Sequence, residues 1–351
     1  MKNQLICLLV MLVLLGCSKQ SPSSPPATPT PATATAVPKI MVVVTPEALE
    51  RRQVKQQALT LLNDQDYDGL EVLAAKYRAS QECHASGLWK LQQFYAGLAH
   101  QAVAAEPLWQ SRERELRKWL QARPASMTAH VALAEFLADY AWKARGNDVA
   151  DVVTETGWRL MAERLQAAGE ILEAVSQRED KCPVYWSTRQ TIALGQELKR
   201  ARYDELFKQA IKAFPDFEDY YNRRAVFLLP RWHGTDGELA RDLDKSADRV
   251  GGDAGDMLYA RVVWSLHGYG STNVFKEHNL SWERTARGFD AIIKKFPDSL
   301  QAQNEAAHLA SLAHDQPSAR KYFLLTQGQV DLTLWRNKDR FVACYKWALG
   351  M

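Results

Sequence analysis

The sequence predicts an all-α fold for the chain after residue 38, arranged as an irregular solenoid of helical hairpins. Apolar residues recur every three or four positions through most of this region, which is the period of an amphipathic helix. Several of these helices end at a proline and are followed by a second helix with a face of small residues. No stretch alternates apolar and polar residues convincingly over the length of a strand.

The clearest hairpin lies between residues 289 and 323. Phe289 and Phe296 belong to the apolar stripe of its first helix, and Pro297 ends that helix because proline cannot continue it. Pro317 suits the first turn of a third helix. The small face of the middle helix consists of alanines 302, 306, 307, 310 and 313.

This arrangement resembles the tetratricopeptide repeat (TPR), in which helix pairs stack into a solenoid. The sequence Phe-Pro-Asp occurs at 214–216 and again at 296–298, and a weaker copy surrounds Pro124. The two clear copies are 297 − 215 = 82 residues apart, which is no whole multiple of the ~34-residue repeat period. We therefore expect TPR-like hairpins without a regular repeat, in one domain over residues 39–351.

Helices are predicted from Thr45-Pro46-Glu47, a capping residue followed by a first-turn proline and acid, to residue 349. In the helix predicted at 152–175, Trp158 and Met161 are placed on one apolar face. Residues 40–44 are expected to be an extended segment packed on the domain, with a membrane-seeking patch as the alternative. The apolar stripes of the first two predicted helices lie at 54–62 and 70–77. The further predicted helices include residues 88–104, 108–122, 127–144, 185–198, 203–214, 217–229, 239–247, 254–266, 282–296 and 343–349.

The N-terminus resembles that of a bacterial lipoprotein. An apolar run at 5–15 is too short to cross a bilayer but suits a signal peptide over residues 1–16. Leu14-Leu15-Gly16-Cys17 resembles a lipobox, which implies cleavage before Cys17 and diacylation of its sulfur; an ordinary secretory signal is the alternative. Ser18 stands where inner-membrane retention would usually show Asp, so the resemblance implies an outer-membrane lipoprotein facing the periplasm, with the leaflet left open.

Residues 17–38 are predicted to form a disordered tether behind the lipid. Six prolines and many Ala, Thr and Ser residues cannot build a core. Such a chain reaches about 65 Å when extended at ~3.1 Å per residue. The folded domain is therefore expected to stand off the membrane.

Between Trp89 and the C-terminus, five motifs follow one another in order: Trp142–Gly146, Pro230–Gly234, Tyr259–Trp264, Phe296–Ser299 and Trp347-Ala348. Together they resemble a bacterial family of unknown function, domain-of-unknown-function family 4034. The resemblance implies a TPR-like fold and no known activity. Asn147-Asp148 departs from the glycine-containing turn expected after Gly146.

No catalytic, metal or cofactor motif is found. The eight histidines are scattered, and His-x-x-x-His, Gly-x-Ser-x-Gly and a P-loop are absent. The net charge of +3 does not favour a nucleic-acid partner. Cys83 and Cys182, at predicted helix ends, are a possible disulfide pair, and free thiols at these two positions and at Cys344 are the alternative.

Trp142, Arg145, Trp232 and His233 are the candidate binding residues because they lie in or near predicted loops, beside glycine or proline. An arginine can grip a carboxylate or phosphate, and a tryptophan can stack on a sugar or an aromatic group. Alternatively, the tryptophan plugs a helix pair and the arginine bonds helix carbonyls. We favour this structural role because fold motifs outnumber site motifs in repeat proteins.

These observations favour a lipid-anchored periplasmic binding or scaffold protein that engages a protein or peptide through a concave helical surface. Its membrane contact would be the lipid on Cys17. Two alternatives stay open. One is a cell-envelope enzyme acting on cell-wall material, with residues assembled from distant helices, and the other is a purely structural outer-membrane component.

Overall fold

The computed structural model describes residues 39–99, 104–146, 150–335 and 337–351. The all-α prediction is confirmed: the described residues form seventeen α-helices and only two strands, each of two residues. Residues 39–351 make one compact unit. The predicted signal peptide, Cys17 and the tether lie outside the described residues.

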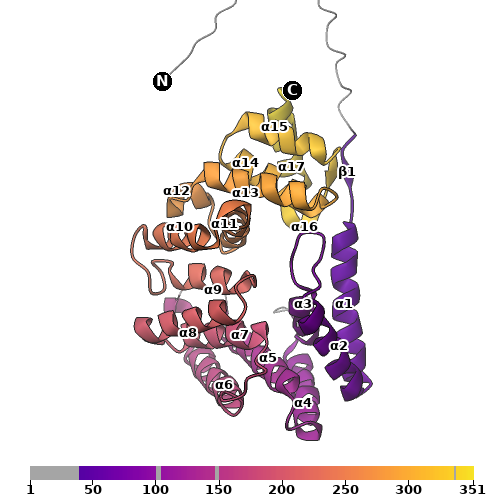
Figure 1. Cartoon of the computed structure of the whole chain (residues 1–351), viewed down its shortest axis with the longest axis vertical. Coiled ribbons are helices and arrows are strands. Elements are labelled where there is room, and N and C mark those ends of the chain that lie inside the picture. Colours follow the sequence, from indigo (N-terminus) through magenta and orange to yellow (C-terminus); the bar gives the residue numbers. More distant parts are fainter. Residues whose placement is uncertain (1–38, 100–103, 147–149, 336) are drawn as a thin grey trace, which may run out of the picture. The chain divides into compact units, whose positions relative to one another are not determined.

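The elements follow one another with short connections (Figure 1). The first nine are β1 (Met41–Val42), α1 (Pro46–Asn63), α2 (Tyr67–Ser80), α3 (Lys90–Leu98), α4 (Glu106–Ala122), α5 (Met127–Arg145), α6 (Glu155–Glu173), α7 (Pro183–Gly195) and α8 (Arg200–Ala213). The next five are α9 (Asp219–Phe227), α10 (Glu238–Val250), α11 (Gly252–His267), α12 (Val274–His278) and α13 (Trp282–Lys295). The last five are α14 (Leu300–Leu312), α15 (Gln316–Leu325), β2 (Gln329–Val330), α16 (Leu332–Trp335) and α17 (Lys338–Leu349).

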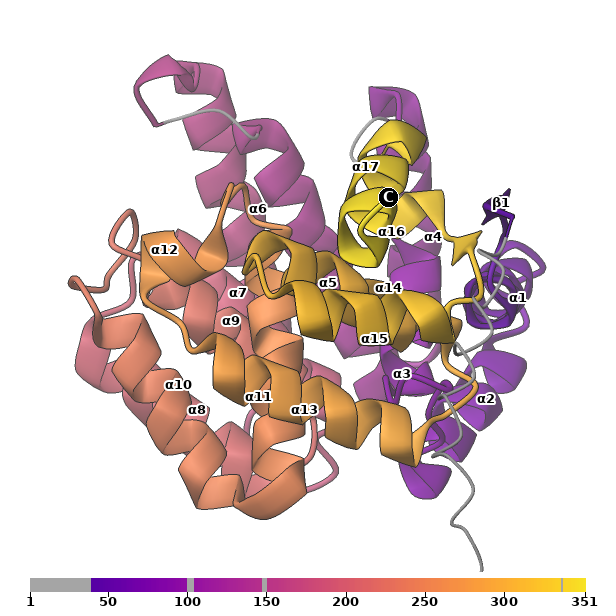
Figure 2. The same cartoon turned by 90° about the horizontal axis from the view of Figure 1, so that it is seen from above.

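Helices pack mainly on helices one or two places along the chain. The most extensive pairs are α5 with α6, α11 with α13, α1 with α3, and α14 with α15. Figure 2 shows α10, α11 and α13 side by side, and α14 next to α15. A core of alanine, leucine and aromatic side chains runs through these contacts without a break.

The hairpin predicted at 289–323 forms as expected. α13 ends at Lys295, just before Pro297, and the side chain of Ser299 caps α14 by accepting a hydrogen bond from the Ala302 amide at 3.3 Å. Pro317 lies in the first turn of α15. The alanines of the middle helix are buried up to residue 310, so α14 is covered closely by its neighbours.

The extended segment predicted at 40–44 is confirmed and packs on the domain. β1 pairs in parallel with β2, with Met41 opposite Gln329 and Val42 opposite Val330. The amide of Met41 donates to the Gly328 carbonyl at 2.9 Å. Figures 1 and 2 show this pairing beside the C-terminal helices. The expectation that the domain has no strand is wrong for these two short strands. The sequence did not reveal them because β1 and β2 lie near opposite ends of the domain's sequence.

Trp158 was wrongly placed on the buried face of its helix. α6 begins only at Glu155, capped by Thr154, and Trp158 in its first turn is 40% exposed while Met161 is buried. The first turn of α6 therefore presents its tryptophan partly to solvent.

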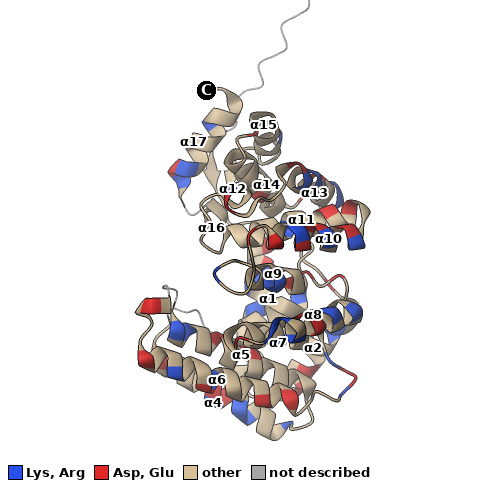
Figure 3. Cartoon of the chain, turned by 90° about the vertical axis from the view of Figure 1, so that its left-hand side faces the viewer, with Lys and Arg blue, Asp and Glu red and all other residues tan. Residues whose placement is uncertain are grey.

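Charged side chains of both signs intermix on the helix surfaces. Figure 3 shows Lys/Arg and Asp/Glu side by side along α10, α11 and α13. Arg284 of α13 joins these three helices through ion pairs with Asp244, Asp248 and Asp256. Within the described residues, none of the helices combines the length and the apolar composition needed to span a membrane.

Candidate functional site

Three of the four candidate binding residues come together in space. The rings of Trp142 and Trp232 meet edge to face with their centroids 5.6 Å apart. The guanidinium carbon of Arg145 lies 5.6 Å from the ring centroid of Trp232 and 5.5 Å from that of Trp158. We call Trp142, Arg145, Trp158 and Trp232 the Trp142 cluster. Sequence reasoning missed Trp158 because it assigned that ring to the core.

Two backbone features hold the Trp142 cluster. α5 ends at Gly146, whose φ of 76° favours glycine and whose amide donates to the Trp142 carbonyl. Trp232 sits on a tight turn after α9, and its amide donates to the Leu229 carbonyl at 2.8 Å. A Cβ on Gly234 would lie 1.9 Å from the Leu228 carbonyl oxygen, so this turn requires glycine.

His233 lies on the same turn but faces another partner. Its ring stacks on Phe227 with centroids 4.4 Å apart, and its amide donates to the Phe227 carbonyl. Phe227 in turn stacks on Tyr203 of α8 at 3.6 Å. His233 therefore ties the turn to α8 and α9, and no ring contact joins it to Trp232 within the described residues.

The contacts of the Trp142 cluster are those of a structural support. Arg145 donates to the carbonyl of Gly146 at 3.0 Å, the type of bond expected of an arginine that closes a helix end. Trp142 packs close to Gly195 of α7 and is half-buried. The arginine lies near two rings of its own chain, so both its charge and its plane already have contacts. Its role in binding a partner stays a prediction.

A group of acids not singled out from the sequence lies between α5 and α9. Glu135 and Asp139 are one turn apart on α5 and interact electrostatically with Arg223, which bonds Asp219 at 2.8 Å. Burial, and secondarily the Asp139 charge, raises the pKa of Glu135 to about 8. Desolvation by the neighbouring helices likewise raises the pKa of Asp139, although this residue is exposed to solvent on α5. Two acids four residues apart in an otherwise apolar helix were the signal that could have revealed this group.

Glu135 can hold a proton at neutral pH, but the acids show no arrangement for metal binding. The described part of the chain contains no group of three or more His, Cys, Asp or Glu residues that could hold a metal ion. A raised pKa in a cluster of charged groups is also common in structural networks. The acids alone therefore identify no reaction.

The possible disulfide between Cys83 and Cys182 is not formed in the structure, where both residues and Cys344 are free thiols. Cys182 is completely buried next to Tyr95, with the sulfur 3.5 Å from the hydroxyl. Cys83 is exposed, and its thiol donates to the Gln81 carbonyl. The two thiols thus occupy different environments, one inside the core and one at the surface.

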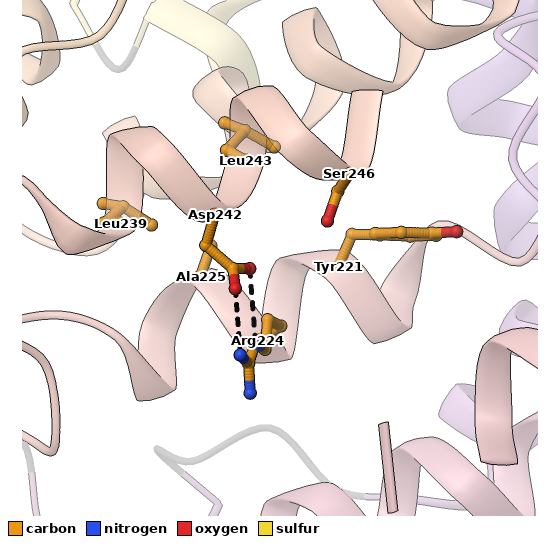
Figure 4. A pocket seen from close by; sticks show the side chains of 7 residues that line it. All are labelled: Tyr221, Arg224, Ala225, Leu239, Asp242, Leu243 and Ser246. Atoms are coloured by element: carbon orange, nitrogen blue, oxygen red, sulfur yellow. Dashed lines mark hydrogen bonds and ion pairs between the residues drawn. The ribbon is translucent and has the colours of Figure 1, made fainter. Parts of the chain in front are cut away.

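One small cavity lies between α9 and α10 (Figure 4). It encloses only about 10 Å³ beside Tyr221, and Arg224 crosses it to form two hydrogen bonds with Asp242, at 2.9 and 3.2 Å. The Arg224 guanidinium also bonds Asp204 of α8. This cavity has room for about one water molecule, so the ion pair fastens helices and leaves no place for a ligand.

A larger cleft, of about 300 Å³, opens where the loop before α3 meets the second half of the chain. It is lined by parts of segments 81–89, 215–221, 250–261 and 295–296. We call it the Trp89 cleft. None of the four sequence-predicted binding residues lines it. Sequence reasoning missed it because its four walls are far apart along the chain.

Comparison with known proteins assigns no family. No protein-family model matches this chain, and no curated protein is similar to it.

Proposed function

We propose that this protein is a lipid-anchored periplasmic binding protein whose helical domain holds a protein or peptide partner. The observation that carries the proposal is the Trp89 cleft, a solvent-accessible hollow with mixed apolar and polar walls in a domain of consecutively packed helices. Helical-hairpin solenoids characteristically bind peptides and proteins on their inner surfaces. The domain is proposed to be a TPR-like solenoid with such a concave face, related to domain-of-unknown-function family 4034.

The location follows from the sequence. Lipid on Cys17 and the proline-rich tether would hold the domain at the outer membrane on its periplasmic side. The apolar run before Cys17 has the length of a signal-peptide core. Replacing Cys17 by Ser should block lipid attachment and release the protein from the membrane fraction. A variant processed at the same site and retained in the outer membrane would contradict the anchor.

Binding is tested by crosslinking in intact cells, recovery of the full-length protein, and identification of the attached partner. The partner is then purified, and its affinity is measured by calorimetry. We expect saturable binding with one partner per domain. Recovery of no partner above the level of an unrelated lipoprotein, or a recovered protein that does not bind after purification, would contradict the proposal.

A cell-envelope enzyme is the second candidate, and Glu135 and Asp139 favour it. Both acids have a raised pKa near Arg223, as general acids often do. They line neither the Trp89 cleft nor the small cavity of Figure 4, so we rank binding above catalysis. Hydrolysis of purified cell-wall fragments that is lost in Glu135→Gln would reverse this order.

A further inference from the structure

The Trp89 cleft is built from segments that are far apart in the sequence. Trp89 and Gly87 come from the loop before α3, Met257 and Arg261 from α11, and Phe296 from the end of α13. Trp89 packs edge to face on Phe217 with centroids 5.5 Å apart, which fixes one wall. Trp89 and Met257 are each less than 9% exposed, so the cleft borders the core directly.

Arg261 is held in place by two fixed partners. One terminal nitrogen donates to the Ser86 carbonyl at 2.6 Å, and the other forms an ion pair with Glu218 at 3.1 Å. A Cβ on Gly87 would lie 2.2 Å from this guanidinium, and the φ of Gly87 is 88°. Glycine at this position therefore allows the arginine to reach the loop, and the arginine makes a rigid part of the cleft wall.

The lining carries no net charge. Its two basic residues, Arg261 and Lys295, are balanced by two acids, Asp216 and Glu218. Arg261 already has its carboxylate partner in Glu218, so the cleft does not require a charged ligand. Trp89, Met257, Leu258 and Phe296 contribute apolar wall, and polar and apolar atoms share the exposed lining of the cleft about equally.

The volume fits one side chain. An apolar cavity of about 150 Å³ holds a benzene molecule, and the Trp89 cleft is about twice that size, near the lower limit of small-molecule sites. Interfaces are commonly anchored by one large apolar side chain that enters such a pocket. The exposed polar rim, which includes Gln81 and Asp216, suits the backbone of the same partner.

From these observations we propose that the Trp89 cleft receives one large, uncharged apolar side chain, aromatic or branched, from the peptide or protein partner. This inference rests on the proposed binding function and specifies its anchor. It differs from the sequence-based prediction, which placed binding at Trp142, Arg145, Trp232 and His233.

The test uses three small probes with the full-length protein: N-acetylphenylalaninamide, N-acetylleucinamide and N-acetylglycinamide. Cys83 lines the cleft and is an exposed thiol, whereas Cys182 is buried. Its alkylation rate, read from the Cys83 peptide by mass spectrometry, therefore reports occupancy. We expect the phenylalanine and leucine amides to slow alkylation at least threefold at saturation. Their dissociation constants should be on the order of millimolar, since each offers few atoms.

Ala254→Trp should abolish this protection by filling the cleft. Ala254 is exposed near the start of α11 and lines the cleft. The matched control is Ala201→Trp, an exposed alanine in the first turn of α8 that does not line it. Both variants should melt like the parent protein, and only the control should retain protection of Cys83.

Equal protection by the glycine amide, absence of protection by all three probes, or undiminished protection in a folded Ala254→Trp variant would overturn the inference. Its failure can be told apart from failure of the proposed function. If the purified partner binds Ala254→Trp with unchanged affinity, the cleft assignment is wrong and the binding function stands. If the probes protect Cys83 but no partner is recovered from cells, the binding function is wrong and the cleft is a small-molecule site.

Discussion

The Trp142 cluster and the Trp89 cleft contain the same residue types but differ in what those residues do. Each combines tryptophan, arginine and a glycine with positive φ. In the cluster, Arg145 lies near two indole rings, and the side chains link α5, α6 and the turn after α9. In the cleft, Arg261 is held by Glu218 and by the Ser86 carbonyl, and a hollow with mixed polar and apolar walls stays open beside it.

The difference shows that aromatic and cationic residues beside loops do not by themselves mark a binding site. The two sites differ in the partners of their arginine. Arg145 lies against aromatic rings, whereas Arg261 bonds a carboxylate and a backbone carbonyl. On this basis we expect the cluster to act mainly on stability and the cleft mainly on binding.

The largest effect is expected from Trp142→Ala. Removing this half-buried ring leaves a cavity beside Gly195 and deprives Trp232 of its partner, so unfolding should become easier by about 2–4 kcal/mol. Urea denaturation measures this change. Leu108→Ala, at an exposed position, should change it by less than about 0.5 kcal/mol. A stable Trp142→Ala variant that no longer binds the purified partner would instead make the cluster a binding anchor.

Glu135 and Glu218 should contribute differently to the pH dependence of the free energy of unfolding. Glu135 ionises near its ordinary value of 4.5 when unfolded but near 8 when folded. Its contribution to stability is therefore fully present below about pH 4.5 and is lost as the pH rises toward 8. Glu135→Gln should raise the free energy of unfolding by roughly 1–3 kcal/mol at pH 8 relative to the parent, and by almost nothing at pH 4.

Glu218 provides the contrast. Burial raises its pKa too, but the charge of Arg261 opposes the shift. Glu218→Gln should therefore flatten the pH profile less than Glu135→Gln does, and at pH 8 it should leave Arg261 without its carboxylate. Denaturation curves from pH 4 to pH 9 compare the two variants. A larger flattening from Glu218→Gln would show that its ion pair is weaker than the geometry indicates.

The smallest effect is expected from Arg145→Ala. Contacts of a guanidinium with partly exposed rings contribute about 0.5–1 kcal/mol each. The free energy of unfolding should therefore fall by about 1 kcal/mol in this variant. Arg159→Ala, whose side chain is 59% exposed in an ion pair with Glu163, serves as the control and should be close to neutral. Thermal melting distinguishes them. A loss equal to that of Trp142→Ala would mean that Arg145 holds the end of α5 as strongly as the ring does.

Much of the helical structure could be predicted from the sequence because its signals are local. Pro297 and Pro317 act within one or two turns of their own positions, and the structure confirms both. The extended segment at 40–44 was also predicted correctly as packed on the domain. Periodicity, capping and proline geometry need no knowledge of distant residues.

Tertiary structure alone decided which distant segments meet. β1 pairs with β2, and Trp142 contacts Trp232. The Ser86 carbonyl accepts a hydrogen bond from Arg261, which lies 175 residues further along the chain. Tertiary packing likewise decided that Trp158 is exposed, that Cys83 and Cys182 are unbonded, and that burial raises the pKa of Glu135. Hydrophobic periodicity specifies which face of a helix is buried but not against what, because the hydrophobic effect has no direction. The Trp89 cleft forms where four segments that are distant in the sequence meet and leave an open space between them.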